Sequence, residues 1–185
     1  MLSFKAYLKE GIENDVVEKA SKKVHVFAGR FQPLHQGHLN IINSMKNPVV
    51  AIVKGKASSA DRARNPLPEK YQIELIKKAA PKAKVMVVST GYIPELANEL
   101  RKQGMEMEAF YAGADRISSY TRQFNSINAK LPDEKKFDVK MKETPRFTSA
   151  TIVRNTIKDN DIEAFKPLMP KSLHGEWDKL RKFIK

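Results

Sequence analysis

The chain has 185 residues, of which 41% are hydrophobic and 30% charged, and these values are typical of one globular domain. It contains no cysteine, which excludes disulfides, thiol catalysis and thiolate metal sites. Its apolar runs are short and no secretory signal pattern is present, so a membrane span is not expected. The net charge of +13 favours polyanions, but the basic residues are spread along the chain without a nucleic-acid-binding fingerprint.

Strand and helix patterns alternate along the chain after residue 23. Strands are predicted at 24–28, 48–53, 84–89, 108–111 and 137–141, and helices at 39–45, 71–80, 94–102, 117–128 and after Ser149. This alternation is typical of a doubly wound α/β fold, with a five-stranded parallel sheet and flanking helices. Because ligands of such sheets bind at the carboxyl ends of the strands, the segments after strands one, four and five are expected to share one cleft.

Residues 29–38 (Gly-Arg-Phe-Gln-Pro-Leu-His-Gln-Gly-His) join the first predicted strand to the first helix. A turn of this kind directs backbone N–H groups and the positive end of the helix dipole to one place, which favours an anion. His35 and His38 are three residues apart, so both rings can lie on one side of the first helical turn. The segment therefore suits the phosphates of a nucleoside triphosphate, although two histidines can also simply cap a helix.

Three later segments could contribute to the same cleft. Residues 147–154 begin a helix at which Thr148 or Ser149 can act as N-cap, with Arg154 one turn further on. Residues 55–68 form a long, polar and basic loop, which we interpret as a flap over the substrates. Residues 111–116 follow a predicted strand and begin another helix. Each segment on its own is also consistent with an ordinary loop or capped helix.

The first segment resembles the His-x-Gly-His signature of the nucleotidyltransferase superfamily, whose fold is Rossmann-like. The sequence of this segment is especially similar to that of the corresponding motif in archaeal-type nicotinamide mononucleotide adenylyltransferases. Residues 147–154 are similar to the superfamily's Ile-Ser-x-Thr-x-Ile/Val-Arg motif, with Ala150 where many relatives have glycine or serine. Residues 64–69 and 113–115 look like two further elements of these adenylyltransferases, but Gln72 replaces an arginine that is usual there.

The resemblance implies nucleotidyl transfer, in which a phosphate oxygen of an acceptor attacks the α-phosphorus of a nucleoside triphosphate and pyrophosphate leaves. His35 and His38, in their charged form, would donate to the α- and β-phosphates, and Arg154, Ser149 and Thr151 would hold the pyrophosphate. The implied nucleotide-binding residues also include Gly29, Arg30, Phe31, Gly113 and Asp115, and the implied flap residues are Lys56, Arg64 and Asn65. A Mg²⁺ ion would be carried on the substrate phosphates, without a dedicated set of protein ligands.

Three functions follow as hypotheses. The leading one is synthesis of NAD from ATP and nicotinamide mononucleotide. The second is a cytidylyltransferase, or a pantetheine-phosphate-type enzyme, with another phosphorylated acceptor. The third is a basic phage internal head protein that keeps the fold and binds nucleic acid. The sequence leaves the base, the acceptor and any self-association open.

The two ends of the chain are expected to differ in role. Residues 1–22 resemble a capsid-targeting leader of large tailed bacteriophages, with a prohead protease site between Glu10 and Gly11, but they could equally form a helix packed on the domain. Residues 23–185 form the nucleotidyltransferase domain, on which helices within 163–185 are expected to pack through Trp177. The expected location is the cytoplasm, that of the host for a phage protein, or a virion head if the leader is used.

Overall fold

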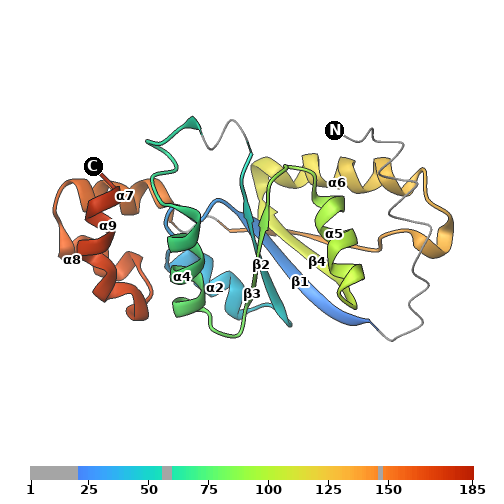
Figure 1. Cartoon of the computed structure of the whole chain (residues 1–185), viewed down its shortest axis with the longest axis horizontal. Helices are drawn as coiled ribbons and strands as arrows, with labels where there is room; N and C mark the ends of the chain where they lie inside the picture. The colour runs from blue at the N-terminus through green and yellow to red at the C-terminus, as the bar shows by residue number, and fades with distance from the viewer. Residues whose placement is uncertain (1–20, 56–59, 146–147) are drawn as a thin grey trace.

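The computed structural model describes residues 21–55, 60–145 and 148–185, so residues 1–20 of the expected leader, with the cleavage site, lie outside the described residues. Five parallel strands form one sheet in the order β3-β2-β1-β4-β5 (Figure 1). The strands are β1 (Lys22–Gly29), β2 (Pro48–Val53), β3 (Lys84–Val88), β4 (Met105–Gly113) and β5 (Lys140–Thr144). The predicted α/β fold, Rossmann-like with an all-parallel five-stranded sheet, is confirmed.

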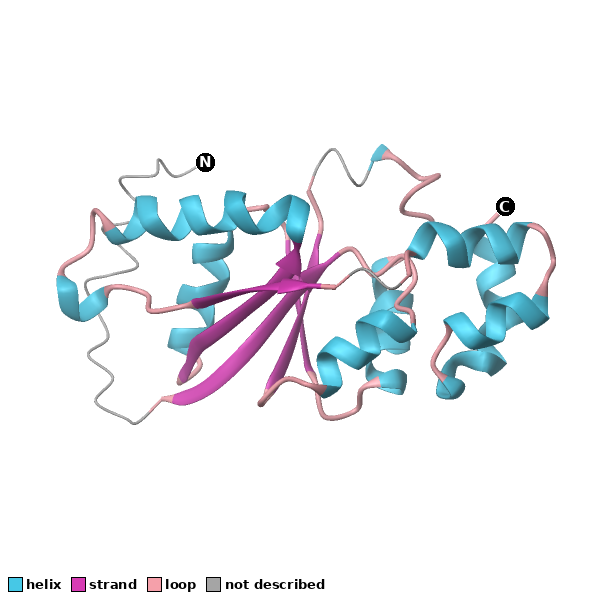
Figure 2. Cartoon of the chain, turned by 180° about the vertical axis from the view of Figure 1, so that it is seen from behind, coloured by secondary structure: helices cyan, strands magenta, loops and turns pink. Residues whose placement is uncertain are grey.

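Helices cover both faces of the sheet (Figure 2). The longer ones are α2 (Gln36–Asn43), α4 (Glu69–Ala79), α5 (Ile93–Lys102), α6 (Ala114–Asn128), α7 (Ala150–Lys158) and α9 (Trp177–Phe183). The shorter ones are α8 (Ile162–Phe165) and the 3₁₀ helices η1 (Asp133–Lys135), η2 (Lys166–Leu168) and η3 (Lys171–Glu176). None of the helices in the described part of the chain is long and apolar enough to cross a membrane.

Alternate side chains of the central strands supply two separate cores. In β1, Phe27 packs with α2, α4, α7 and α9, whereas Val26 and Ala28 pack with α5 and α6. In β2, Ile52 belongs to the first core and Ala51 to the second. All five residues are buried, as expected for a parallel sheet covered on both faces.

The order of the strands places the expected site at the middle of the sheet. β1 lies between β2, which follows it in the chain, and β4, so the direction of winding reverses between β1 and β4. Ligands of open α/β sheets bind in the crevice outside the carboxyl ends of the strands at such a switch point. The segment after β1, which holds both histidines, begins at this position.

The fifth strand begins at Lys140, three residues later than predicted, because Phe137 is held elsewhere. The side-chain amide of Asn128 accepts from Phe137 N and donates to Phe137 O, both at 2.9 Å. The guanidinium of Arg101 lies 3.9 Å from the centre of the Phe137 ring and donates to the carbonyls of Lys135 and Lys136. The backbone groups that a strand would have used are therefore already paired.

Replacing Asn128 with alanine is expected to lower the free energy of unfolding by about 2 kcal/mol, because two partly buried backbone groups of Phe137 lose their partners. Urea denaturation measures this change. An exposed residue of the same helix, Asn125, provides the matched control, and its alanine variant is expected to unfold like the unmodified protein. Equal stability of the Asn128 and Asn125 variants would contradict the assigned role of Asn128.

The residues after α7 form several short helical pieces, because Pro167 and Pro170 interrupt the helical hydrogen-bond pattern. They nevertheless complete the first core. Trp177 packs edge to face on Phe165, with ring centres 4.8 Å apart, and Leu180 is fully buried. These pieces cover α4 and α7, the two helices that border the expected site (Figure 1).

Candidate active site

The start of α2 is closed by a reciprocal pair of histidine contacts. His38 N donates to His35 Nδ1 at 3.4 Å, and His35 N donates to His38 Nδ1 at 3.3 Å. The two imidazole rings stack with their centres 3.6 Å apart and an angle of 18° between their planes. This arrangement is a capping box in which both capping groups are imidazoles, and it fixes both rings at the helix start.

The capping box also sets the protonation state of the rings. Because each Nδ1 accepts a backbone N–H, the proton of each neutral ring is on Nε2. Burial lowers the pKa of His35 to about 4, and burial together with the charge of His35 holds the pKa of His38 well below its usual value. Without a ligand, the protein therefore presents two neutral Nε2–H donors, and the charged form expected beside phosphates stays a prediction for the nucleotide complex.

The low pKa of His35 predicts that the protein loses stability in acid. Between pH 6.5 and about 4 the unfolded chain binds a proton at His35 and the folded chain does not, so the free energy of unfolding falls as pH is lowered through this interval. The loss from His35 approaches about 3 kcal/mol. His35→Asn keeps an N-cap acceptor without an imidazole, so urea denaturation at pH 7.5 and pH 5 should show a smaller difference for this variant. An undiminished difference would contradict the burial of His35.

Two glycines permit the close packing around the histidines. A Cβ atom on Gly29 would lie 3.0 Å from the Phe31 ring, and one on Gly37 would lie 3.3 Å from both the His35 ring and Thr148 Cγ2. Phe31 itself has a φ of 48°, and its buried ring packs edge to face on His38 at 4.9 Å. The Phe31 ring therefore supports His38 from the core, and the expected contribution of Phe31 and its backbone to the phosphate site stays a prediction.

The second motif lies beside the first. Ser149 is the N-cap of α7, since its side chain accepts from Ile152 N at 3.3 Å. Arg154 is buried, and its guanidinium donates to Gln32 O at 2.7 Å and to Thr151 Oγ1 at 3.1 Å. The Gln32 contact joins residues that are 122 positions apart, so the predicted convergence of the segments after β1 and β5 is observed.

Positive charge gathers around Arg154. Burial and the positive charges of Arg30 and Arg64 lower the pKa of Arg154, while the carboxylate of Asp61 acts in the opposite direction. The start of α7 adds the positive end of its dipole beside that of α2. The site is therefore prepared for a ligand with several negative charges.

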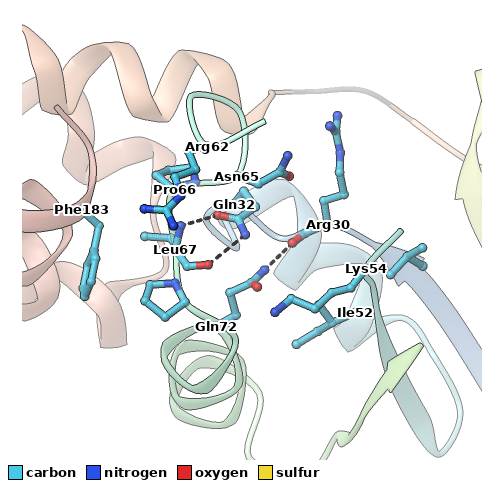
Figure 3. Close-up of a pocket in the computed structure, with 12 residues that line it drawn as sticks. Arg30, Gln32, Ile52, Lys54, Arg62, Asn65, Pro66, Leu67, Gln72 and Phe183 are labelled. Atoms are coloured by element: carbon cyan, nitrogen blue, oxygen red, sulfur yellow. Dashed lines mark hydrogen bonds between the residues drawn. The ribbon is translucent and has the colours of Figure 1, made fainter. Parts of the chain in front are cut away.

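A cavity of about 430 Å³ opens beside these residues (Figure 3). It is lined by Arg30, Gln32, Ile52, Val53, Lys54, Arg62, Asn65, Pro66, Leu67, Pro68, Gln72 and Phe183. Its volume is within the usual range for small-molecule sites. Three lining side chains are cationic and none carries a carboxylate, although Lys54 is paired with Glu69 at 2.9 Å.

Two buried glutamines hold the walls of this cavity together. The amide of Gln32 accepts from Leu67 N at 2.8 Å and donates to Leu67 O at 3.2 Å. Gln72 Nε2 donates to Phe31 O at 3.1 Å and also to Arg30 O (Figure 3). The turn after β1 is therefore tied to residues 62–68 and to α4, and through Gln32 O it is also tied to Arg154.

The other predicted site residues differ in whether they line the cavity. Asn65 lines the cavity, while Arg64 is exposed and lies 3.5 Å from the carboxylate of Asp61. Gly113 is the N-cap of α6 at the end of β4, but neither Gly113 nor the exposed Asp115 is among the residues that line the cavity. Lys56, the remaining flap residue, lies outside the described residues.

Sequence reasoning missed three residues of the site. The Gln32 and Gln72 contacts join distant segments, and the only signal in the sequence was that Gln72 departs from the arginine of similar proteins. Thr148 had been considered only as an alternative N-cap. Since Ser149 fills that role, the buried Thr148 Oγ1 has no hydrogen-bond partner among the described residues and lies beside Gly37.

Comparisons with known proteins agree with this arrangement. A family model described as cytidylyltransferase-like matches residues 26–156, whereas no protein of curated function matches the sequence significantly. Thermotoga maritima TmcAL bound with alpha-thio ATP has a similar fold, with a TM-score of 0.52 and 11% identity over 85% of this chain. The match covers 55% of TmcAL, so this chain corresponds to about half of that protein.

A second solved structure, Plasmodium falciparum nicotinic acid mononucleotide adenylyltransferase complexed with APC, has a TM-score of 0.51 and 17% identity. The match covers 88% of this chain and 98% of that one. At such identities the two likenesses concern the fold alone. The family model, in contrast, covers well over half of the sequence and includes His35, His38 and Arg154. The chain belongs to the cytidylyltransferase-like family of nucleotidyltransferases.

Proposed function

We propose that this protein transfers AMP from ATP to nicotinamide mononucleotide, forming NAD and releasing pyrophosphate. The observation that carries the proposal is the convergence of two helix starts, two histidines and Arg154 outside the carboxyl end of β1. This arrangement suits a triphosphate, and the adjoining cavity offers space for a phosphorylated acceptor. The choice of acceptor rests on the resemblance of residues 29–38 and 64–66 to motifs of nicotinamide mononucleotide adenylyltransferases. The adenylyltransferase of similar fold is consistent with this choice.

In this reaction an acceptor phosphate oxygen forms a bond to the α-phosphorus while the bond from that phosphorus to the bridging oxygen breaks. The attacking phosphate is already ionised, so no side chain has to remove a proton. Catalysis then depends on positioning and on stabilising negative charge as pyrophosphate departs. The buried, preorganised donors of this site supply that stabilisation.

His35 and His38 would act as neutral donors when the triphosphate arrives. Their Nε2–H groups have no acceptor among the described residues, since the Nδ1 atoms are occupied by the capping box. A bound phosphate favours the protonated imidazole and so raises its pKa. The histidines can therefore strengthen their hydrogen bonds as charge develops, without being charged beforehand.

The leaving group would lie at the start of α7. Ser149 is held there by its contact with Ile152 N, and Arg154 by its contact with Thr151 Oγ1, while Thr148 Oγ1 has no hydrogen-bond partner among the described residues. A Mg²⁺ ion held by the substrate phosphates would neutralise part of their negative charge. The lining of the cavity fits an ion held by the phosphates, because its polar side chains are cations and amides instead of carboxylates.

The proposal is tested by measuring pyrophosphate release with ATP or CTP against a panel of acceptors. The panel contains nicotinamide mononucleotide, phosphocholine, glycerol phosphate and pantetheine phosphate. We expect the highest kcat/KM with ATP and nicotinamide mononucleotide. Faster turnover with CTP or another acceptor would replace the proposed substrates, and no turnover with any pair would contradict nucleotidyl transfer. In the latter case, binding of DNA or RNA in a gel-shift assay would favour the nucleic-acid-binding alternative.

A further inference from the structure

We propose that Phe183, on the last helix of the chain, is the surface against which a planar ring of the acceptor stacks. The proposal rests on the proposed function, because it assigns the cavity to the phosphorylated acceptor. It adds a specificity-determining residue and a ligand class, namely a phosphomonoester that carries an aromatic, electron-poor ring. No sequence motif pointed to α9 as part of the site.

The cavity has chemically different sides. Arg30 and Lys54 lie on one side and Phe183 on the opposite side. Pro66, Leu67 and the third cationic side chain, Arg62, lie between them (Figure 3). The cationic side adjoins the turn that leads to the histidines, so it suits the phosphate of the acceptor. Phe183 is the one aromatic residue among those that line the cavity, and it stands where the remainder of such an acceptor would lie.

Phe183 differs from its neighbours on α9 in keeping part of its surface free. Leu180 on α9 and Ile184, which directly follows the helix, are buried in the first core, whereas Phe183 is only partly buried and reaches the cavity. The Phe183 ring also contacts the Tyr71 ring, at 5.3 Å between centres and 36° between planes. The ring is therefore supported from the protein side while the cavity remains beside it.

The support under Phe183 is itself fixed by contacts between α4 and the C-terminal segment. Tyr71 donates to Glu176 at 3.0 Å, and Lys78 pairs with the same carboxylate at 2.6 Å. Lys179 Nζ lies 4.1 Å from the centre of the Tyr71 ring and 3.0 Å from Glu74. These contacts hold α9 in one position on α4, as a stacking surface requires.

The ligand class follows from this geometry. An aromatic ring stacked on Phe183 gains favourable offset contact, and a positively charged ring gains a further cation–π attraction. The pyridinium ring of nicotinamide mononucleotide has both properties. A sugar phosphate without the ring gains neither, although it would meet the same cationic side of the cavity.

A binding experiment with two matched ligands tests the proposal. Isothermal titration calorimetry measures the Kd of nicotinamide mononucleotide and of ribose 5-phosphate, which lacks the pyridinium ring. We expect the full chain to bind nicotinamide mononucleotide about tenfold more tightly, the preference that a stacked ring provides. Phe183→Leu is expected to remove this preference and leave the Kd of ribose 5-phosphate unchanged, whereas Phe183→Tyr, which keeps a ring, should retain it. Lys182→Ala, at an exposed neighbouring position, is the control and should behave like the unmodified protein.

The outcomes separate this inference from the proposed function. The stacking role would be overturned if the unmodified protein bound the two ligands equally or bound neither of them. It would also be overturned if a folded Phe183→Leu variant kept the preference for nicotinamide mononucleotide. Circular dichroism establishes whether the Phe183→Leu variant is folded. If that variant is unfolded, the Phe183→Tyr variant provides a second test, because loss of the ligand preference in Phe183→Tyr would also count against stacking. The expected preference without any pyrophosphate release would support the ring site and contradict the proposed reaction.

Discussion

The His38→Ala variant is expected to lose about 100- to 1000-fold in kcat at saturating substrates, the usual effect of removing one donor that stabilises transition-state charge. The reason is the position of the His38 Nε2–H, which is fixed by the contact of His38 Nδ1 with His35 N and by the supporting Phe31 ring. A donor that is already oriented costs no reorganisation when the negative charge grows. The affinity for ATP should change much less than kcat, because the helix starts and Arg154 still bind the phosphates.

The alanine variant also removes a buried ring and leaves His35 N without its acceptor, so its thermal melting must be compared with that of the unmodified protein. His38→Asn is the matched variant, since its side-chain oxygen can accept from His35 N while the imidazole is absent. Both variants should be slow if the Nε2–H donor matters for catalysis. A His38→Asn protein with nearly unchanged kcat, measured by pyrophosphate release, would show that His38 only caps the helix.

The fold could be predicted because local signals and overall topology agree. The apolar runs of β1 and β2 are typical of strands buried on both faces, and their spacing along the chain requires helical crossovers. The position of His35 at a helix start followed from the same reasoning, as did Ser149 at the start of α7. These features depend on residues that are near one another in the sequence.

Other features depend on contacts between distant segments and were predicted incorrectly or missed. The beginning of β5 is set by Asn128 and Arg101, whose side chains bind backbone groups around Phe137 that would otherwise be available for strand pairing. The low pKa of His38 results first from burial and then from the charge of His35, and a pattern of residue types does not reveal burial at a helix start. The role of Gln72 becomes visible only in the structure, where its side chain donates to the carbonyl groups of Arg30 and Phe31.

The two buried glutamines, Gln32 and Gln72, join segments of the site that are far apart in the sequence through hydrogen bonds. Gln32 links Leu67, which lines the cavity that we propose for the acceptor, to Arg154, which we propose holds pyrophosphate. The two subsites share one hydrogen-bonded unit, and a variant of Arg154 reports on both.

The Arg154→Ala variant is expected to raise the KM for ATP about 10- to 100-fold, the effect of losing one charged, buried hydrogen-bonding group. The guanidinium contacts Gln32 O and Thr151 Oγ1 on the protein side and leaves its positive charge available to the β- and γ-phosphates. The KM for the acceptor should rise less, through the Gln32 link alone.

Arg154→Lys separates charge from geometry, because lysine keeps the positive charge but cannot donate to Gln32 O and Thr151 Oγ1 in the same planar arrangement. Its KM for ATP should therefore lie between those of the unmodified and alanine proteins. Steady-state kinetics with each substrate varied in turn, together with melting temperatures, measure these differences. If the KM for the acceptor rises while that for ATP is unchanged, Arg154 serves the acceptor, and the assignment of the two subsites must be reversed.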